Sequence, residues 1–228
     1  MQVKQLHTAI YLFMATLLAA ACSKMNDPHD PYLKRGETIY VGRVDSARVL
    51  AGNGRVLLRY WTSDPKAKRM VVYWNSRTDS TVLDIPTKLR SDSVDVIIAE
   101  LGEFNYLFEM VTMTKELANR SIVFQKGGAA YGGRFQASLT ERVIKSKAYV
   151  PASGQLTLVW LGAVEKAVAC DITYTDKAGA TLTKRVPITE NNTVIKDVGG
   201  NVRYTTLFLP EANAIDTFST PAKAVPLN

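Results

Sequence analysis

Side chains that could catalyse a reaction are scarce in this sequence, and histidine is the scarcest. The 228-residue chain has two histidines, His7 and His29. His7 lies in an apolar N-terminal leader and His29 in the polar stretch behind it, so we expect none in the folded part. This excludes Ser-His-Asp and Cys-His nucleophiles, histidine general acid–base catalysis and His-ligated zinc. Of the two cysteines, Cys22 lies next to the N-terminal leader, and only Cys170 lies in the part expected to fold. A single cysteine cannot form a thiolate metal site, and Cys170 is expected to be a buried, inert thiol.

Four acidic residues close together in sequence are the other source of chemistry, because a glycoside hydrolase needs a pair of carboxylates. They are Glu100, Glu103, Glu109 and Glu116. Glu109 falls inside a predicted strand and is expected to face solvent, and the others are expected in loops and turns. We therefore predict no catalytic residue, no metal site and no cofactor, with a carboxylate-dependent hydrolase as the most remote alternative.

Binding is the class of function that the aromatic residues favour. Tyr73 and Trp74 are neighbours in the predicted strand 69–75, where successive side chains face opposite ways. One of the two rings therefore lies outside the core, where a sugar ring can stack on it. If Tyr73 faces the core, Trp74 is the candidate ligand-binding residue; the alternative is that Trp74 packs under a neighbouring strand. Tyr131 and Phe135 are further candidates with the same ambiguity.

The elements that must position these residues are predicted to be short β-strands. Runs rich in Val, Ile, Thr and Tyr alternate with turn sequences such as Asn53-Gly54 and Asp64-Pro65. The runs are 55–61, 69–75, 80–85, 93–98 and 106–113. Their close spacing predicts an antiparallel β-sandwich.

The same layout occurs twice in the chain. Segment 43–61 (RVDSARVLAGNGRVLLRYW) aligns without a gap on segment 142–160 (RVIKSKAYVPASGQLTLVW), and Trp closes both. We therefore predict an all-β chain of two tandem antiparallel β-sandwiches, the second more degenerate. The predicted boundaries are 39–126 for the first sandwich, 127–141 for a linker that could contain a short helix, and 142–228 for the second. The predicted core aromatic residues are Trp61, Tyr106, Trp160 and Tyr204.

Core-type residues in the first half follow a known order. They are Val56, Leu58, Trp61, Pro65, Val71, Tyr73, Leu101, Tyr106 and Phe108. This pattern resembles the fibronectin type III family, over residues 40 to 126. The resemblance implies that the second-strand Trp packs in the core. It also implies that Leu101 and Tyr106 bracket a tyrosine corner, in which the hydroxyl ties the start of a strand to the preceding loop.

The N-terminus has the parts of a secretory signal peptide. Lys4 supplies positive charge, and the apolar run Ala9–Ala21, of about thirteen residues, is too short to span a bilayer, which takes about 20. Three small residues then precede Cys22. This arrangement resembles the bacterial lipobox, although Ala19 stands where that family usually has Leu.

The lipobox resemblance implies that the chain is cut before Cys22 and that a diacylglyceryl group is attached to its thiol. Residues 1–21 would then be a lipoprotein signal peptide, and 22–38, polar and proline-bearing, a flexible tether. An ordinary signal peptide cut after Ala21 is the alternative. No Asp follows Cys22 directly, and in enteric lipoproteins an Asp at that next position marks retention at the inner membrane, so we expect the outer membrane and the cell surface.

Short strings along most of the chain resemble a family of Gram-negative surface lipoproteins of unknown function. They are Asn26-Asp27-Pro28, Tyr73-Trp74-Asn75, Tyr131-Gly132 with Phe135-Gln136-Ala137-Ser138-Leu139, and Leu209 through Phe218. The resemblance implies a cell-surface or glycan-uptake setting and brings no catalytic residues.

The net charge of +7 is spread over the chain, and its densest cluster, Lys66, Lys68 and Arg69, follows an apparent turn. No basic stripe with interleaved aromatic residues is present, so no nucleic-acid partner is expected. The expected function is a lipid-anchored binding module whose partners are the membrane and a polysaccharide or a surface-complex protein. A structural spacer in a surface uptake complex is the alternative.

Overall fold

The structure is a computed structural model that describes residues 40–86 and 93–228. The chain divides into two units, Met1–Tyr40 and Val41–Asn228. The predicted signal peptide, the lipidation site Cys22 and the tether lie outside the described residues. Within the described ranges, no helix is both long enough and apolar enough to cross a membrane.

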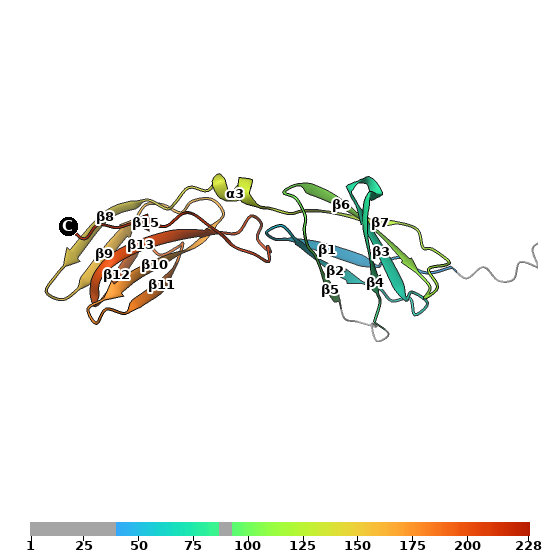
Figure 1. The fold of residues 1–228 in the computed structure, drawn as a ribbon, viewed down its shortest axis with the longest axis horizontal. Helices are drawn as coiled ribbons and strands as arrows, with labels where there is room; N and C mark the ends of the chain where they lie inside the picture. Colours follow the sequence, from blue (N-terminus) through green and yellow to red (C-terminus); the bar gives the residue numbers. More distant parts are fainter. Residues whose placement is uncertain (1–39, 87–92) are drawn as a thin grey trace, which may run out of the picture. The chain divides into compact units, whose positions relative to one another are not determined.

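Two antiparallel sheets form the first β-sandwich (Figure 1). The first sheet has the order β1-β2-β5, with β1 at Ser46–Ala51, β2 at Val56–Trp61 and β5 at Val94–Ile98. The second has the order β4-β3-β6-β7, with β3 at Arg69–Trp74, β4 at Asp79–Asp84, β6 at Asn105–Met113 and β7 at Phe124–Ala129. Alternate apolar residues of β2, β3 and β6 meet between the sheets and form one core.

The second β-sandwich has the same two-sheet layout. One sheet has the order β12-β9-β8, with β8 at Ile144–Val150, β9 at Gln155–Trp160 and β12 at Asn192–Ile195. The other has the order β11-β10-β13-β14, with β10 at Ala167–Asp176, β11 at Thr181–Pro187, β13 at Val198–Phe208 and β14 at Phe218–Ser219; β15, at Lys223–Ala224, also pairs with β13. The predicted all-β fold of two tandem antiparallel sandwiches is confirmed.

The segment between the sandwiches differs from the predicted linker at its start. Gly127 and Gly128 belong to β7, and the only helix of the segment is α3, the short Gly133–Ala137. A Cβ atom on Gly128 would lie 2.2 Å from Cγ1 of Val49 in β1, so glycine here allows β1 to lie close against β7. Gly128 is therefore required for packing inside the first sandwich.

The buried aromatic residues differ from the prediction in one place. Tyr106, Trp160 and Tyr204 lie in the two cores, whereas Trp61 is half-buried and its neighbour Tyr60 is fully buried. The prediction that Trp61 is a core residue is wrong, because the alternation of β2 places Val56, Leu58 and Tyr60 on the inner face.

Local contacts support two further sequence predictions. The Tyr106 hydroxyl donates a 3.0 Å hydrogen bond to the Gly102 carbonyl, which is the contact of a tyrosine corner. Cys170 is buried in the second core beside Ile172 of the same strand face, and desolvation raises the pKa of its thiol. A thiol with a raised pKa carries little thiolate at neutral pH, so Cys170 acts as a small hydrophobic residue.

Candidate ligand-binding site

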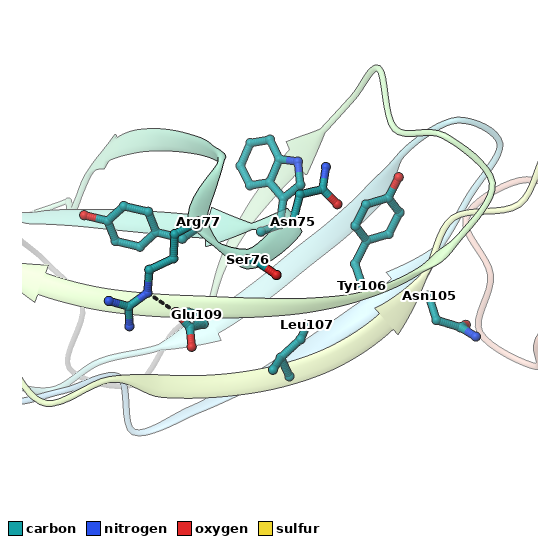
Figure 2. A pocket seen from close by; sticks show the side chains of 9 residues that line it. Asn75, Ser76, Arg77, Asn105, Tyr106, Leu107 and Glu109 are labelled. Atoms are coloured by element: carbon teal, nitrogen blue, oxygen red, sulfur yellow. Dashed lines mark hydrogen bonds and ion pairs between the residues drawn. The ribbon is translucent and has the colours of Figure 1, made fainter.

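The second sheet of the first sandwich contains a notch at the end of β3. Strand β6 pairs with β3 only from Met113 to Glu109, yet it continues to Asn105 alongside β7. Residues 105–108 of β6 therefore have no β3 partner on one side, because β3 ends at Trp74 and its hairpin turns towards β4. A cavity of about 480 Å³ lies there, lined by residues 73–77 and 105–107 and by Glu109 (Figure 2).

The hairpin beside the notch has an unusual backbone. Its turn η1, Asn75–Arg77, has three consecutive non-glycine residues in the left-handed region, with φ of 49°, 55° and 68°. Asn tolerates that conformation, but for Ser76 and Arg77 it costs roughly 1–2 kcal/mol each. Strain of this kind is concentrated at functional sites, where the surrounding structure holds it in place.

Several hydrogen bonds hold this turn. The Thr78 backbone N–H and hydroxyl both donate to the Asn75 carbonyl, at 3.1 and 2.7 Å. The Asn75 side-chain amide donates to the Asp79 carboxylate across the end of the hairpin. The strained conformation is thus fixed from two sides, and it presents Ser76 and Arg77 to the notch in a set position.

The polar wall of the notch is a closed network around Glu109. Arg77 donates to one carboxylate oxygen of Glu109, and Gln125 donates to the other at 2.7 Å; Figure 2 shows the Arg77–Glu109 pair. These bonds, with Arg77 the larger contributor, hold the pKa of Glu109 below its usual value. Arg77 also lies over the Tyr73 ring, with Cζ 5.5 Å from its centroid. Glu109 is therefore an ionised hydrogen-bond acceptor.

The two aromatic residues of β3 face the opposite way from the arrangement in which Tyr73 is in the core and Trp74 is outside it. Trp74 packs against the main core, with its ring centroid 6.4 Å from that of Phe108, whereas Tyr73 packs on the other face of the sheet with Val111 and Met113. Both rings are half-buried, and both line the notch because it opens at the end of β3. The candidate residue Trp74 is thus part of the site, together with Tyr73.

The other two candidates, Tyr131 and Phe135, do not line the notch. The Tyr131 hydroxyl donates to Glu211 at 3.2 Å, and its ring is 5.0 Å from that of Phe135. Phe135 in turn lies edge-on to Phe218, at 5.1 Å between ring centroids. These half-buried rings pack against one another, which favours a structural role.

The C-terminal string Leu209 through Phe218 makes further contacts of this structural kind. Asp216 accepts hydrogen bonds from the Asn53 backbone N–H at 2.9 Å and from two nitrogens of Arg55 at 2.9 and 2.6 Å. Bonding to Arg55 lowers the pKa of Asp216. The Ile215 N–H donates to the Ala51 carbonyl at 2.7 Å, so two consecutive residues of the string bind the β1–β2 turn.

The four acidic residues considered for hydrolysis are not arranged as an acid and a base. Glu103 accepts from the backbone N–H groups of Arg134 and Phe135, at 2.7 Å each, and so fixes the start of α3. Glu100 and Glu116 are exposed. Among the described residues, every resolved shift of a carboxyl pKa is downward, whereas a general acid needs a raised one. The same residues contain no group of three or more His, Cys, Asp or Glu side chains that could hold a metal ion.

Sequence reasoning missed Ser76, Arg77 and Asn105 as site residues. The polar turn Asn75-Ser76-Arg77 directly after two aromatic residues was the available signal. Its left-handed backbone and the early end of β3–β6 pairing depend on tertiary structure and leave no mark in the pattern of residue types.

The fold is a pair of fibronectin type III-like β-sandwiches. The chain belongs to DUF4998, a family described as a domain of unknown function, whose model matches residues 22–218. Similar solved structures include the FN1–FN3 domains of chicken CNTN1, with 12% identity, a TM-score of 0.43 and coverage of 82% of this chain and 64% of that one. A two-domain fibronectin type III segment of chicken tenascin has 14% identity, a TM-score of 0.32 and coverage of 80% and 99%. No curated protein matches the chain.

Proposed function

We propose that the protein is a lipid-anchored module of the cell envelope that binds a glycan in the notch and catalyses no reaction. The observation that carries the proposal is the notch itself, which is lined by a strained polar turn, by unpaired strand residues and by two half-buried aromatic residues from opposite faces of β3. The contacts of Thr78 and Asp79 with Asn75 hold Ser76 and Arg77 in one position, so the notch is already formed before a ligand binds.

The composition of the notch suits a sugar. Its volume of about 480 Å³ is within the range of small-ligand pockets, roughly 300–1,000 Å³. Tyr73 and Trp74 supply ring surface for the apolar face of a sugar, and Asn75, Arg77 and Glu109 supply amide, guanidinium and carboxylate groups for its hydroxyls. The downward pKa shift of Glu109 favours acceptance of hydrogen bonds over proton donation.

The proposed anchor is the acylated Cys22 at the outer membrane, with the sandwiches at the cell surface. The lipobox-like residues before Cys22 support it, as does the family match, which begins at Cys22. Each buried CH₂ of an acyl chain contributes about 0.8 kcal/mol, so several chains on one residue hold a soluble domain at a membrane. Mass spectrometry of the native mature chain tests this step: a first residue without acyl mass contradicts the anchor.

The binding step is tested by calorimetry with a panel of polysaccharides. We expect at least one to bind, and Trp74→Ala to weaken it by tenfold or more because the ring surface is lost. Trp61→Ala is the matched control, since Trp61 is also half-buried but does not line the notch. No binding across the panel, or equal binding by Trp74→Ala and Trp61→Ala, contradicts glycan binding at this site.

A structural spacer in a surface uptake complex is the second candidate function. Two contacts favour it: the Ile215 N–H donates to the Ala51 carbonyl, and Arg55 donates to Asp216. Such contacts stabilise the chain as a support and present no group to a ligand. Co-purification from membranes separates the two functions. A stable protein partner together with no affinity for any glycan supports the spacer.

A further inference from the structure

We infer that the notch takes an uncharged saccharide, and that the Arg77–Glu109 pair excludes acidic sugars from it. This inference rests on the proposed function and names the class of ligand for the same site. It follows from the charges and the free hydrogen-bonding groups that line the notch.

The charges of the notch balance within its own wall. Arg77 is the only cationic side chain among the lining residues, and it is already bonded to Glu109, the only anionic one. Gln125 donates to the second oxygen of Glu109, which fixes the carboxylate in place. The Arg77–Glu109 pair is neutral as a whole, so a sugar carboxylate or sulfate gains no net charge attraction in the notch, and it loses hydration beside the ionised Glu109.

The groups that remain free suit neutral hydroxyls, which both donate and accept. An ionised carboxylate offers about four acceptor positions and a guanidinium five donors. The contacts with Arg77 and Gln125 leave two acceptor positions on Glu109, and Arg77 keeps donors beyond its Nε. Neighbouring hydroxyls on one sugar ring can bond to such an alternating set without bringing a charge into the notch.

The unpaired side of β6 adds neutral backbone groups to this set. In an antiparallel strand, alternate residues direct both their N–H and C=O groups to the same side. Of the residues 105–108, which β3 does not reach, alternate ones therefore direct one donor and one acceptor into the notch. These groups can bond to hydroxyls of either kind and carry no net charge.

The test compares each acidic polysaccharide of the panel with its carboxyl-reduced form by calorimetry at neutral pH. The two forms share ring, linkage and length, and they differ only where a neutral hydroxymethyl group replaces the carboxylate. We expect the reduced, neutral form to bind at least tenfold more tightly to the unmodified protein. In Glu109→Gln, which keeps the side-chain shape and frees the Arg77 charge, we expect this preference to shrink at least threefold or to reverse.

Asp95→Asn is the matched control for that variant. Asp95 forms a bidentate pair with Arg59 at 2.6 Å on the other sheet and does not line the notch, so this change should leave the preference unaltered. Acidic forms that bind as tightly as neutral ones, with both lost in Trp74→Ala, would overturn the inference and leave glycan binding standing. A preference that Glu109→Gln does not change would also overturn it. If no saccharide of either charge binds, the proposed function itself fails.

Discussion

The two sandwiches use matching residues in opposite ways. Trp61 closes β2 and Trp160 closes β9, and both strands have the same length and the same place in the gapless alignment. Trp160 is 3% exposed and lies in the second core, whereas Trp61 is half-buried on the outer face under Arg48, 5.9 Å from its ring centroid. In the first sandwich the core aromatic residue of this strand is Tyr60.

The aligned arginines differ in the same way. Arg43 is exposed, whereas Arg142 is fully buried and donates to the carbonyls of Leu161 and Glu190 and to the side chain of Asn191, at 3.2, 3.0 and 3.1 Å. Its guanidinium also lies over Trp160, 5.2 Å from the ring centroid.

A one-residue offset explains the reversal of the tryptophans. Side chains of a strand alternate with a period of two, so a shift of one residue moves every side chain to the other face. The buried residues are Val56, Leu58 and Tyr60 in β2, and Leu156, Leu158 and Trp160 in β9. Tyr60 is therefore the structural counterpart of Trp160, and the gapless sequence alignment is shifted by one residue from the structural one.

The two cores differ in how fully their polar atoms are bonded. The Trp160 indole donates to Thr193 at 3.0 Å, and the Tyr204 hydroxyl donates to the Arg142 carbonyl at 2.6 Å. In the first sandwich the buried Tyr60 hydroxyl and Thr62 hydroxyl have no partner. The second sandwich therefore depends on a polar network that the first one lacks, which makes the aligned positions unequal in their effect on stability.

The largest effect is expected from the two tryptophans. Trp160→Ala leaves a cavity in the second core and removes the hydrogen bond from the indole to Thr193, and it should cost about 3–5 kcal/mol of unfolding free energy. Trp61→Ala should cost less than half as much, because its ring is half-exposed. Urea unfolding monitored by hydrogen exchange of β9 and β2 peptides measures both. Equal losses would refute the facing assigned to these strands.

The next largest effect on stability is expected from the two aligned arginines, Arg142 and Arg43. Arg142→Ala removes three hydrogen bonds to part-buried acceptors and the cover of Trp160, so we expect a loss of about 2–3 kcal/mol. Arg43→Ala, at the aligned exposed position, should change stability by about 0.5 kcal/mol or less. A loss for Arg142→Ala no larger than that for Arg43→Ala would show that the buried network contributes nothing.

The sequence contains much of the information on which side chains of β2 and β9 face the core. Arg59 shares the face of Trp61 in β2, and a charged residue there marks the outer side. In β9 the polar Gln155 and Thr157 alternate with the residues that are buried. The tyrosine corner at Tyr106 was also predictable, because its contact is local.

The notch was not predictable in this way. It exists because β3 stops pairing with β6 at Tyr73–Glu109 while β6 continues, and where a strand stops pairing is decided by tertiary packing. The Arg77–Glu109 contact joins residues that are far apart in sequence, so no local pattern indicates it. The sequence favours Trp74 only if Tyr73 faces the main core; in the structure Trp74 packs there instead, and both residues line the notch because it opens at the end of β3.

An effect of alkaline pH should be shared by the two sandwiches. Burial raises the pKa of both Tyr60 and Tyr204 from 10 to about 12. Because the unfolded chain loses these protons first, the stabilisation is complete below pH 10 and is lost as pH rises towards 12, at up to about 1.4 kcal/mol per pH unit for each tyrosine. Unfolding curves at pH 9, 10 and 11 measure this, and Tyr60→Phe should reduce the loss in β2 peptides while leaving that in β9 peptides.

The smallest changes in unfolding free energy should come from removing single tyrosine hydroxyls at neutral pH, and these changes should have opposite signs in the two sandwiches. Tyr60→Phe removes a buried hydroxyl that has no partner and should stabilise the first sandwich by about 0.5–1 kcal/mol. Tyr204→Phe removes a hydroxyl that donates to the Arg142 carbonyl and should destabilise the second sandwich by about 1–2 kcal/mol. Both changes leave ring volume unaltered, so packing does not enter the comparison. Hydrogen exchange of β2 and β9 peptides in each variant separates the two sandwiches, and the same sign of change in both would mean that the Tyr60 hydroxyl is hydrogen-bonded after all.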